Sequence, residues 1–517
     1  MERFKKVNSI TIVGGGTAGW LTACYFSRRI TVHQCSPVRP YSDKLEVTII
    51  DKEIPNPIGV GEATILHFGG FMEQMGFPRE HWMRELNAVR KGGILFSGWT
   101  DGSETDNVWH PFGFTDITYN KLKVTNIESL SESTYKVAPM WDIWSKYRDK
   151  FNLIETLACY HSAMQNRVER EKINVYADHL DASRLPIFAK NETKDLVNHI
   201  ESDVVDVVWD GDDIDHLVLK DGREIKSDMY IDCTGFAKLL SKDKKHDIDL
   251  SDRLFTNTAV AGRVEYEDRD SEMHPYTHAC AIDTGWVWIT PITTRIGSGH
   301  VFNRNITDIE EAKENFCDFW EGRVKKEDLK VLKWDPVMSH DPWKGNVVSI
   351  GLSSGFIEPL ESTGIALICR GIEFLEECIK GNCYEEDEKI GYNSRMRGHY
   401  NNAVDIVNLH YAYSQRDTPF WRYVRENHKK SDNQLLFEQD MADPMRVTRQ
   451  TVKNGIFGGH NFAVLAAQHN PDCLAVKEYF CQEEGEENLM SYNVDKYFKD
   501  LRGFIERSTP HKEFIYE

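Results

Sequence analysis

The chain has 517 residues, of which 40% are hydrophobic and 28% charged, so a sizeable core can form and disorder is not indicated. Its 62 Lys and Arg against 82 Asp and Glu give a formal charge of -20. That balance argues against binding to nucleic acid, because the chain has no net positive charge to release counterions from a phosphate backbone. The eleven cysteines include no CxxC pair and no Cys/His ligand spacing, so we expect reduced thiols in a cytoplasmic protein and no metal site. There is no signal-peptide core and no apolar run of about 20 residues, so we expect no membrane-spanning segment.

The N-terminal part has the pattern of a βαβ unit. Ser9–Val13 is a short apolar strand that ends in glycines, and Thr17 begins a helix. A second β-branched strand, Val47–Ile50, runs into Asp51, and the polar insert 36–44 before it is expected to be a surface loop. This order predicts the opening of a Rossmann-type sheet.

The turn between the first strand and the helix fits the dinucleotide-binding motif G-x-G-x-x-G. Gly14 permits the tight turn, Gly16 lets a pyrophosphate approach the backbone, and Gly19 allows the helix to pack on the sheet. Thr17 and Ala18 supply amides at the helix start, where an anion is favoured. A glycine-rich turn without a ligand is the alternative.

Asp51 is the predicted partner of the adenosine ribose, whose hydroxyls it would bind through its carboxylate. It lies 32 positions beyond Gly19, whereas the usual spacing is roughly 20. The polar insert accounts for the excess.

Further strands and helices are predicted along the rest of the chain. The segment 362–378 has helical apolar spacing, and the pattern is mostly helical from about residue 385. Strands are expected near 203–208, 216–219, 228–233, 258–265, 286–289 and 346–351.

A second strand end indicates which nucleotide is bound. Asp232-Cys233-Thr234-Gly235 is similar to the Asp-x-x-Gly strand end that lies beside the first glycine turn in FAD enzymes of the hydroxylase superfamily. Only one G-x-G-x-x-G occurs, so a bound FAD leaves no evident NAD(P)H site. We therefore expect FAD as cofactor, held in part by Asp232 and Gly235.

Three further motifs are far apart in the sequence. They are Gly59–Thr64 followed by Trp82–Asn87 and Lys91-Gly92-Gly93, Gly285–Pro291 followed by Gly297–Gly299, and Gly351–Ile365. Together with Gly14–Trp20, this combination resembles the flavin-dependent halogenases of the tryptophan-halogenase type. The resemblance extends from the N-terminus to about residue 425.

The resemblance implies two catalytic residues. Lys91 matches a lysine that binds hypohalous acid or captures it as a haloamine, and a buried ammonium suits that role. Glu361 matches a glutamate that accepts the ring proton or polarises the halogenating species, with Ser362 as its orienting neighbour. Each has a simpler alternative: a solvated lysine, and an acid that favours a helix N-terminus.

The resemblance also implies residues for the small ligands. The amides of Thr363 and Gly364 match a halide site, and Gly351 belongs to the same cofactor-side segment. Trp286 and Trp288 match the W-x-W-x-I-P signature that keeps organic substrate away from the flavin, although Thr290 replaces the isoleucine.

His110 and Phe112 match the residues that sandwich the aromatic substrate, and flat side chains suit an indole or a phenol. The alternative is a proline turn with a packed phenylalanine.

We therefore predict an α/β fold with a Rossmann-type FAD-binding core, an added antiparallel sheet and a mostly helical C-terminal part. Residues 1–385 would interleave the FAD-binding and substrate-sheet modules, and residues 386–517 would cover the substrate site. The predicted activity is halogenation of an electron-rich aromatic with FADH2, dioxygen and a halide (chloride, bromide or iodide).

A separate NAD(P)H-dependent flavin reductase would supply the reduced flavin, and association of identical subunits stays open. The alternatives are a single-component NAD(P)H-dependent aromatic hydroxylase and a non-catalytic flavin-binding protein.

Overall fold

The computed structural model describes residues 5–33, 45–52, 61–104, 106–111, 177–241 and 247–431, together with 435, 455–458, 461–462, 465 and 469. The chain divides into two compact units, each built from three stretches of sequence. The first unit takes Met1–Asn87, Leu180–Ser251 and Lys333–Asn401, and the second takes Ala88–His179, Asp252–Leu332 and Asn402–Glu517.

A six-stranded sheet in the order β21-β22-β13-β2-β3-β9 organises the first unit. All neighbouring strands in it are parallel except the edge pair β21 and β22. The strands are β21 (Trp343–Lys344), β22 (Val347–Ser349), β13 (Met229–Asp232), β2 (Ser9–Val13), β3 (Glu46–Asp51) and β9 (Asn198–Glu201). Ile10, Ile12 and Ile49 have no exposed surface, as expected for parallel strands covered on both faces.

The parallel strands end at one edge of this sheet. The register places Val13 beside Ile50 on one side and Asp232 on the other, and Asp232 beside Ser349. The glycine turn, Asp51, the loop after Asp232 and the Gly351 segment therefore all leave the sheet at the edge where open α/β sheets bind ligands.

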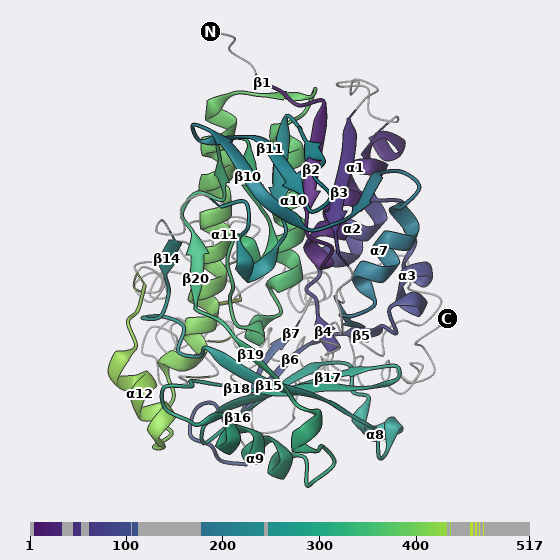
Figure 1. Ribbon diagram of the computed structural model, residues 1–517. Coiled ribbons are helices and arrows are strands. Elements are labelled where there is room, and N and C mark those ends of the chain that lie inside the picture. The colour runs from purple at the N-terminus through teal and green to yellow at the C-terminus, as the bar shows by residue number, and fades with distance from the viewer. Residues whose placement is uncertain are drawn as a thin grey trace, which may run out of the picture. The chain divides into compact units, whose positions relative to one another are not determined.

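Helices of the first unit pack around this sheet (Figure 1). Helix α1 (Thr17–His33) contacts β3, α7 (Leu185–Thr193) and α10 (Gly364–Cys378). Helix α10 also contacts α2 (His67–Gln74), which lies against α3 (Arg79–Glu85).

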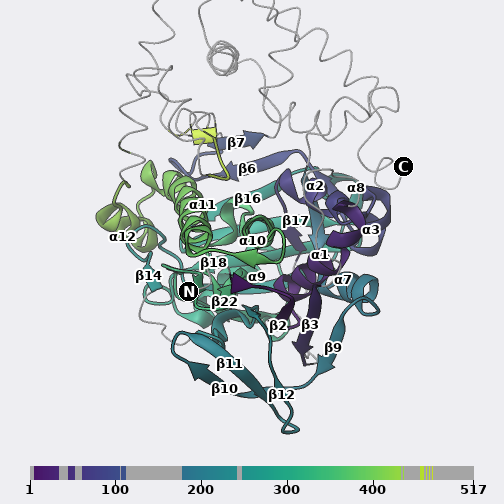
Figure 2. The same cartoon turned by 90° about the horizontal axis from the view of Figure 1, so that it is seen from above.

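Smaller strands complete this unit. An antiparallel ribbon follows β9 along the chain and is seen in Figure 2. Its strands are β10 (Val204–Asp210), β11 (Asp213–Leu219) and β12 (Glu224–Ile225). The short pairs are β1 (Lys5–Lys6) with β23 (Cys383–Tyr384) and β14 (Asp247–Asp249) with β20 (Val337–Ser339), and β4 spans Gly61–Ala63.

A seven-stranded sheet in the order β19-β15-β18-β17-β16-β6-β7 organises the second unit. Its central strands form an antiparallel meander, and β6 joins β16 in parallel. The strands are β19 (Lys330–Lys333), β15 (Thr258–Val264), β18 (Arg295–Phe302), β17 (Gly285–Ile292), β16 (Thr277–Ile282), β6 (Gly93–Ser97) and β7 (Asn107–Pro111). Beside it, β5 (Val89–Lys91) pairs with β8 (Ala177–Asp181).

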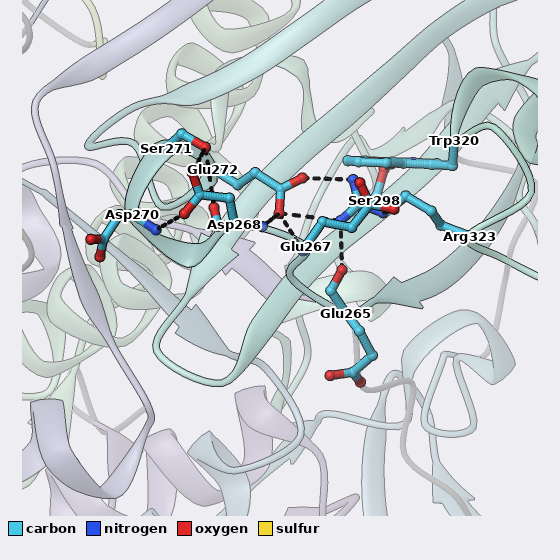
Figure 3. Close-up of polar contacts among 9 residues, drawn as sticks. All are labelled: Glu265, Glu267, Asp268, Asp270, Ser271, Glu272, Ser298, Trp320 and Arg323. Atoms are coloured by element: carbon cyan, nitrogen blue, oxygen red, sulfur yellow. Dashed lines mark hydrogen bonds and ion pairs between the residues drawn. The ribbon is translucent and has the colours of Figure 1, made fainter.

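Helix α9 (Ile309–Phe319) covers one face of this sheet, and its Ala312 and Phe316 join a core with Val260, Val287 and Phe302. Figure 3 shows the polar contacts that the segment after α9 makes with α8 and β18. Arg323 donates to Glu272 from the short helix α8 (Arg269–Glu272) at 2.6 Å and lies 5.0 Å from the ring of Trp320. Trp320 in turn donates to the hydroxyl of Ser298 at 3.0 Å.

The predicted fold class is confirmed, and the strands and the helix at 362–378 appear where the sequence predicts them. Of the helical part expected after residue 385, the structure describes α11 (Glu386–Ala412) and α12 (Pro419–Asn427). Within the described part of the chain, no helix is long and apolar enough to cross a membrane.

Candidate functional site

The glycine turn has the close contacts that its three glycines predict. Gly14 has φ +113°, and a Cβ there would lie 2.3 Å from the carbonyl oxygen of Cys233. A Cβ on Gly19 would lie 1.8 Å from the carbonyl oxygen of Gly14, so α1 approaches the turn as closely as backbone allows. Gly16 faces open space, because a Cβ there would have no neighbouring atom within 4 Å. An opening above the first amides of a 17-residue helix fits a pyrophosphate.

Asp51 lies at the end of β3 with 7% of its surface exposed. Its Oδ1 is 2.6 Å from Nε2 of His199, and its Oδ2 accepts a hydrogen bond from the indole nitrogen of Trp20 at 3.1 Å. Gly15 must be glycine because a Cβ there would lie 2.5 Å from the Asp51 side chain. The predicted ribose carboxylate is therefore held against the glycine turn by two residues that no sequence motif had singled out for this role.

Asp232 organises the loop that follows β13. Its fully buried carboxylate accepts hydrogen bonds from the amide and hydroxyl of Thr234 at 2.9 and 2.6 Å and from the amide of Leu240 at 2.9 Å. Ser353, far away in sequence, donates to it at 3.0 Å. With these donors in place, Asp232 shapes the loop in which Gly235 adopts φ +69°.

Ser353 belongs to the short 3-10 turn η4 (Gly351–Ser353), which begins at another predicted cofactor residue. Gly351 has φ +74°, and a Cβ there would lie 2.8 Å from the Cβ of Ala18. The segment from the third motif is thus packed directly on the start of α1. Gly14, Ala18, Asp232 and Gly351 converge at one edge of the sheet.

Glu361 and its neighbours form a buried turn between η5 (Pro359–Glu361) and α10. Glu361, Ser362 and Thr363 are 1%, 4% and 0% exposed. Ser362 adopts φ +60°, a left-handed conformation that costs a non-glycine residue energy and is common at functional sites. Glu361 is therefore held away from water in a strained turn directly before α10.

Thr363 has a hydroxyl that fits an anion. The residue occupies the N-cap of α10, but its side chain makes no capping hydrogen bond. Its Oγ1 is buried and has no hydrogen-bond partner among the described residues. The neighbouring Gly364 has open space where its Cβ would be. A buried donor beside free helix-start amides suits a halide ion.

Lys91 ends strand β5, where it lies opposite Ala177 of β8. It is 0% exposed. Its neighbour Gly92 donates its amide to the carbonyl of Pro275 at 2.7 Å, which fixes the connection into β6. Fully buried lysines are rare unless they are paired or functional, so the solvated-lysine alternative is wrong for this residue.

Trp286 and Trp288 occupy alternate positions of β17 and are 1% and 8% exposed. Their ring centroids are 6.4 Å apart. The ring of Trp288 covers Gly299, where a Cβ would lie 2.1 Å from it, and the ring of Trp286 lies 6.1 Å from that of Trp99. Gly299 is therefore required for the ring of Trp288 to lie across the neighbouring strand.

His110 lies at the end of β7 and is 1% exposed. Its Nε2 is 2.8 Å from the side-chain nitrogen Nδ2 of Asn461, and its ring is 5.7 Å from that of Phe457. The sequence did not identify Asn461 or Phe457, because they lie about 350 residues further along in a segment without a recognised motif. Phe112 lies outside the described residues.

Glu62, in the predicted Gly59–Thr64 motif, has an unusual pKa. Removal from water raises the pKa of Glu62, in β4, to about 7. A carboxyl group that changes charge near neutral pH is able to exchange protons, which is unusual away from functional sites.

Each unit holds one set of predicted residues. The first contains the cofactor positions, Glu361, Ser362 and the halide positions, and the second contains Lys91, His110, Trp286 and Trp288. Within the first unit, the cofactor positions meet at the carboxyl edge of the sheet.

Comparisons with known proteins identify the family of the chain. A family profile described as tryptophan halogenase matches residues 9–471. The chain is 30% identical over 449 residues to Tryptophan 6-halogenase ThaL of Streptomyces albogriseolus, which covers 81% of this chain and 79% of that protein. It is also 30% identical over 438 residues to Tryptophan 7-halogenase RebH of Lentzea aerocolonigenes, with the same coverages of 81% and 79%. A solved flavin-dependent halogenase from Xanthomonas campestris superposes with a TM-score of 0.79 at 26% identity, covering 99% of this chain and 98% of that one.

Proposed function

Because the chain belongs to the tryptophan halogenase family, we propose that it halogenates an electron-rich aromatic ring through hypohalous acid delivered to Lys91. The observation that carries this proposal is the complete burial of Lys91. Placing an ammonium away from water is costly, and a fold accepts that cost where the charge is paired or where the charge or its proton is used; membership of this family favours the second use.

The flavin would be held at the carboxyl edge of the first unit's sheet. Its pyrophosphate fits over Gly16 and the start of α1, and its adenosine ribose fits beside Asp51. The other residues proposed to hold it are Gly14, Thr17, Ala18, Gly19, Asp232, Gly235 and Gly351. When bound and reduced, the flavin supplies two of the four electrons that reduce dioxygen, and the halide supplies the other two as it becomes hypohalous acid.

The halide would bind at the start of α10. The amides of Thr363 and Gly364 are donors there, and the buried hydroxyl of Thr363 is a third. Three hydrogen-bond donors at the positive end of a helix favour a small anion.

Lys91 would hydrogen-bond the hypohalous acid and direct its halogen toward the ring. The ring carbon then forms a bond to halogen as the oxygen–halogen bond breaks, and the ring proton must leave. Glu361 would accept that proton, with Ser362 fixing its orientation, so that water and the aryl halide are the products.

The aromatic substrate would be an indole or a phenol held by flat side chains. His110 is the described member of the predicted pair with Phe112, and Trp286 and Trp288 would keep the ring from the flavin. Orientation of the ring near Lys91 would determine which carbon reacts.

The reduced flavin would come from a separate NAD(P)H-dependent reductase, because the chain has one dinucleotide motif. The experiment combines the purified protein with FAD, such a reductase, dioxygen, each halide in turn and a panel of indoles and phenols, followed by mass spectrometry. We expect product whose mass follows the halide supplied.

Hydroxylated product, or rapid bleaching of bound FAD by NADPH without a reductase, would support a single-component hydroxylase instead. Absence of any turnover with all halides would support a non-catalytic flavin-binding protein.

A further inference from the structure

Asp51 sits in a frame of three side chains that come from three different elements. His199 comes from β9, Trp20 from α1 and Lys190 from α7. The Nε2 of His199 lies 2.6 Å from Oδ1, the indole nitrogen of Trp20 lies 3.1 Å from Oδ2, and the ammonium of Lys190 lies 3.7 Å from Oδ2. Two hydrogen bonds and one nearby cation thus act on one carboxylate.

The strand register brings His199 onto this carboxylate. Strands β3 and β9 are parallel, with Ile49 opposite His199 and Asp51 opposite Glu201. Side chains of paired residues point to the same face, and so do residues two apart in one strand. His199 and Asp51 therefore meet diagonally on one face of the sheet, as a consequence of the fold and not of a flexible surface contact.

The frame is itself braced. The Trp20 ring lies edge-on to the His199 ring with centroids 5.2 Å apart, and the Lys190 ammonium lies 5.3 Å from the Trp20 ring centroid. The Trp20 side chain is 1% exposed, and the Asp51 side chain is 6% exposed. The carboxylate can rotate only if these neighbours move with it.

The frame also leaves hydrogen-bonding capacity on the carboxylate. An ionised carboxylate has about four lone-pair positions, and His199 and Trp20 occupy one on each oxygen. Among the described residues no other side chain lies within hydrogen-bonding distance, since the Lys190 ammonium is 3.7 Å from Oδ2, so one position on each oxygen matches the two neighbouring hydroxyls of a ribose. An unbraced carboxylate would have to be ordered when the ligand binds, at a cost in affinity.

On the basis of the flavin site proposed above, we propose that His199 is a positioning residue for the adenosine end of the flavin. It acts through Asp51, whose carboxylate it holds in the orientation that the ribose hydroxyls require, with Trp20 as the second brace. His199 makes the shorter of the two hydrogen bonds, so its removal should have the larger effect on affinity.

The test is a double-mutant cycle on FAD affinity, measured by fluorescence titration of the full-length protein. We expect His199→Leu to weaken FAD binding about tenfold, in line with loss of a hydrogen bond to a charged group. His199→Gln keeps an N–H donor and should recover most of that loss. In an Asp51→Ala background, which has no side-chain acceptor for His199, His199→Leu should cost less than about twofold, because the partner through which it acts is gone.

A matched control comes from a second histidine–aspartate pair in the same unit. His216 contacts Asp215 at 2.6 Å on strand β11, away from the carboxyl edge of the sheet. His216→Leu should leave FAD affinity unchanged. If His199→Leu fails to fold, Trp20→Phe removes only the indole donor, and we expect about threefold weaker binding from it.

Three results would overturn the inference: wild-type affinity in His199→Leu, a full tenfold loss that persists in the Asp51→Ala background, or an equal loss in His216→Leu. Each of these leaves wild-type FAD binding, and so the proposed function, intact. Failure of the wild-type protein to bind FAD would instead remove the proposed function and this inference together.

Discussion

Replacing Thr363 by valine should raise the stability of the halide-free protein while weakening its use of halide. The hydroxyl of Thr363 is buried without a partner among the described residues, and an unsatisfied buried hydroxyl costs about 1–3 kcal/mol. Valine has nearly the same shape and removes that cost. For a cooperative unit of 150–250 residues, each 1 kcal/mol gained raises Tm by about 2–4 °C.

The same substitution removes a donor to the anion. A hydrogen bond to a charged group contributes about 1.5–3 kcal/mol, so the KM for halide should rise about tenfold or more while FAD affinity stays unchanged. The assays are thermal melting in halide-free buffer and product formation over a range of halide concentrations. If the halide site is preformed, Thr363→Val should therefore raise the melting temperature and weaken halide binding at the same time.

Thr22 offers a matched control. Its hydroxyl is also fully buried, but it donates to the carbonyl of Ala18 at 2.6 Å. Thr22→Val should lower stability by about 1 kcal/mol and leave the halide dependence unchanged. A lower melting temperature than the wild type in halide-free buffer, together with a normal KM for halide, would show that Thr363 does not serve an anion site.

Two other changes follow from the geometry. Gly19→Ala places a Cβ 1.8 Å from the carbonyl oxygen of Gly14, so the turn must open. FAD affinity, measured by equilibrium dialysis, should fall at least tenfold. Wild-type affinity would contradict the assigned turn. Burial lowers the pKa of His300 from 6.5 to about 4, so the unfolded state binds the extra proton and stability is lost as pH falls from 6.5 toward 4, by about 2 kcal/mol at pH 5. Melting curves from pH 8 to pH 4.5 should show a shallower acid-side decline for His300→Gln, and an unchanged decline would mean that His300 is not the titrating group.

Local patterns were sufficient to predict the opening strand, glycine turn and helix of the first unit. After Ser9, strand β2 consists of β-branched residues because both of its faces are covered, and it ends at a turn that only glycine can form. Each of these constraints acts within a few neighbouring residues. A short segment of sequence is therefore enough to predict the strand and the turn.

Contacts between distant segments could not be predicted in this way. His199 meets Asp51 across 148 positions, and Ser353 meets Asp232 across 121. Both pairs depend on which strands become neighbours in the sheet, and no local pattern specifies that. The partners of His110, Asn461 and Phe457, were missed because they too are far away in the sequence, in a segment without a recognised motif.

Lys91 is the intermediate case. Its neighbouring glycines and the resemblance identified it, but a sequence pattern cannot distinguish a buried ammonium from a solvated one. In the structure it lies on β5 opposite Ala177 of β8 and is fully buried. Its burial is thus a property that only the structure reveals.

The most direct test of the central claim is to separate halide oxidation from ring halogenation with Lys91→Met. Met keeps most of the length and apolar contacts of the lysine stem and removes the ammonium. With chemically reduced FAD, dioxygen and halide, the variant should release hypohalous acid to a small dimedone-type scavenger at the wild-type rate. Its yield of halogenated indole should fall at least a hundredfold. A normal yield of halogenated indole from Lys91→Met would contradict the account.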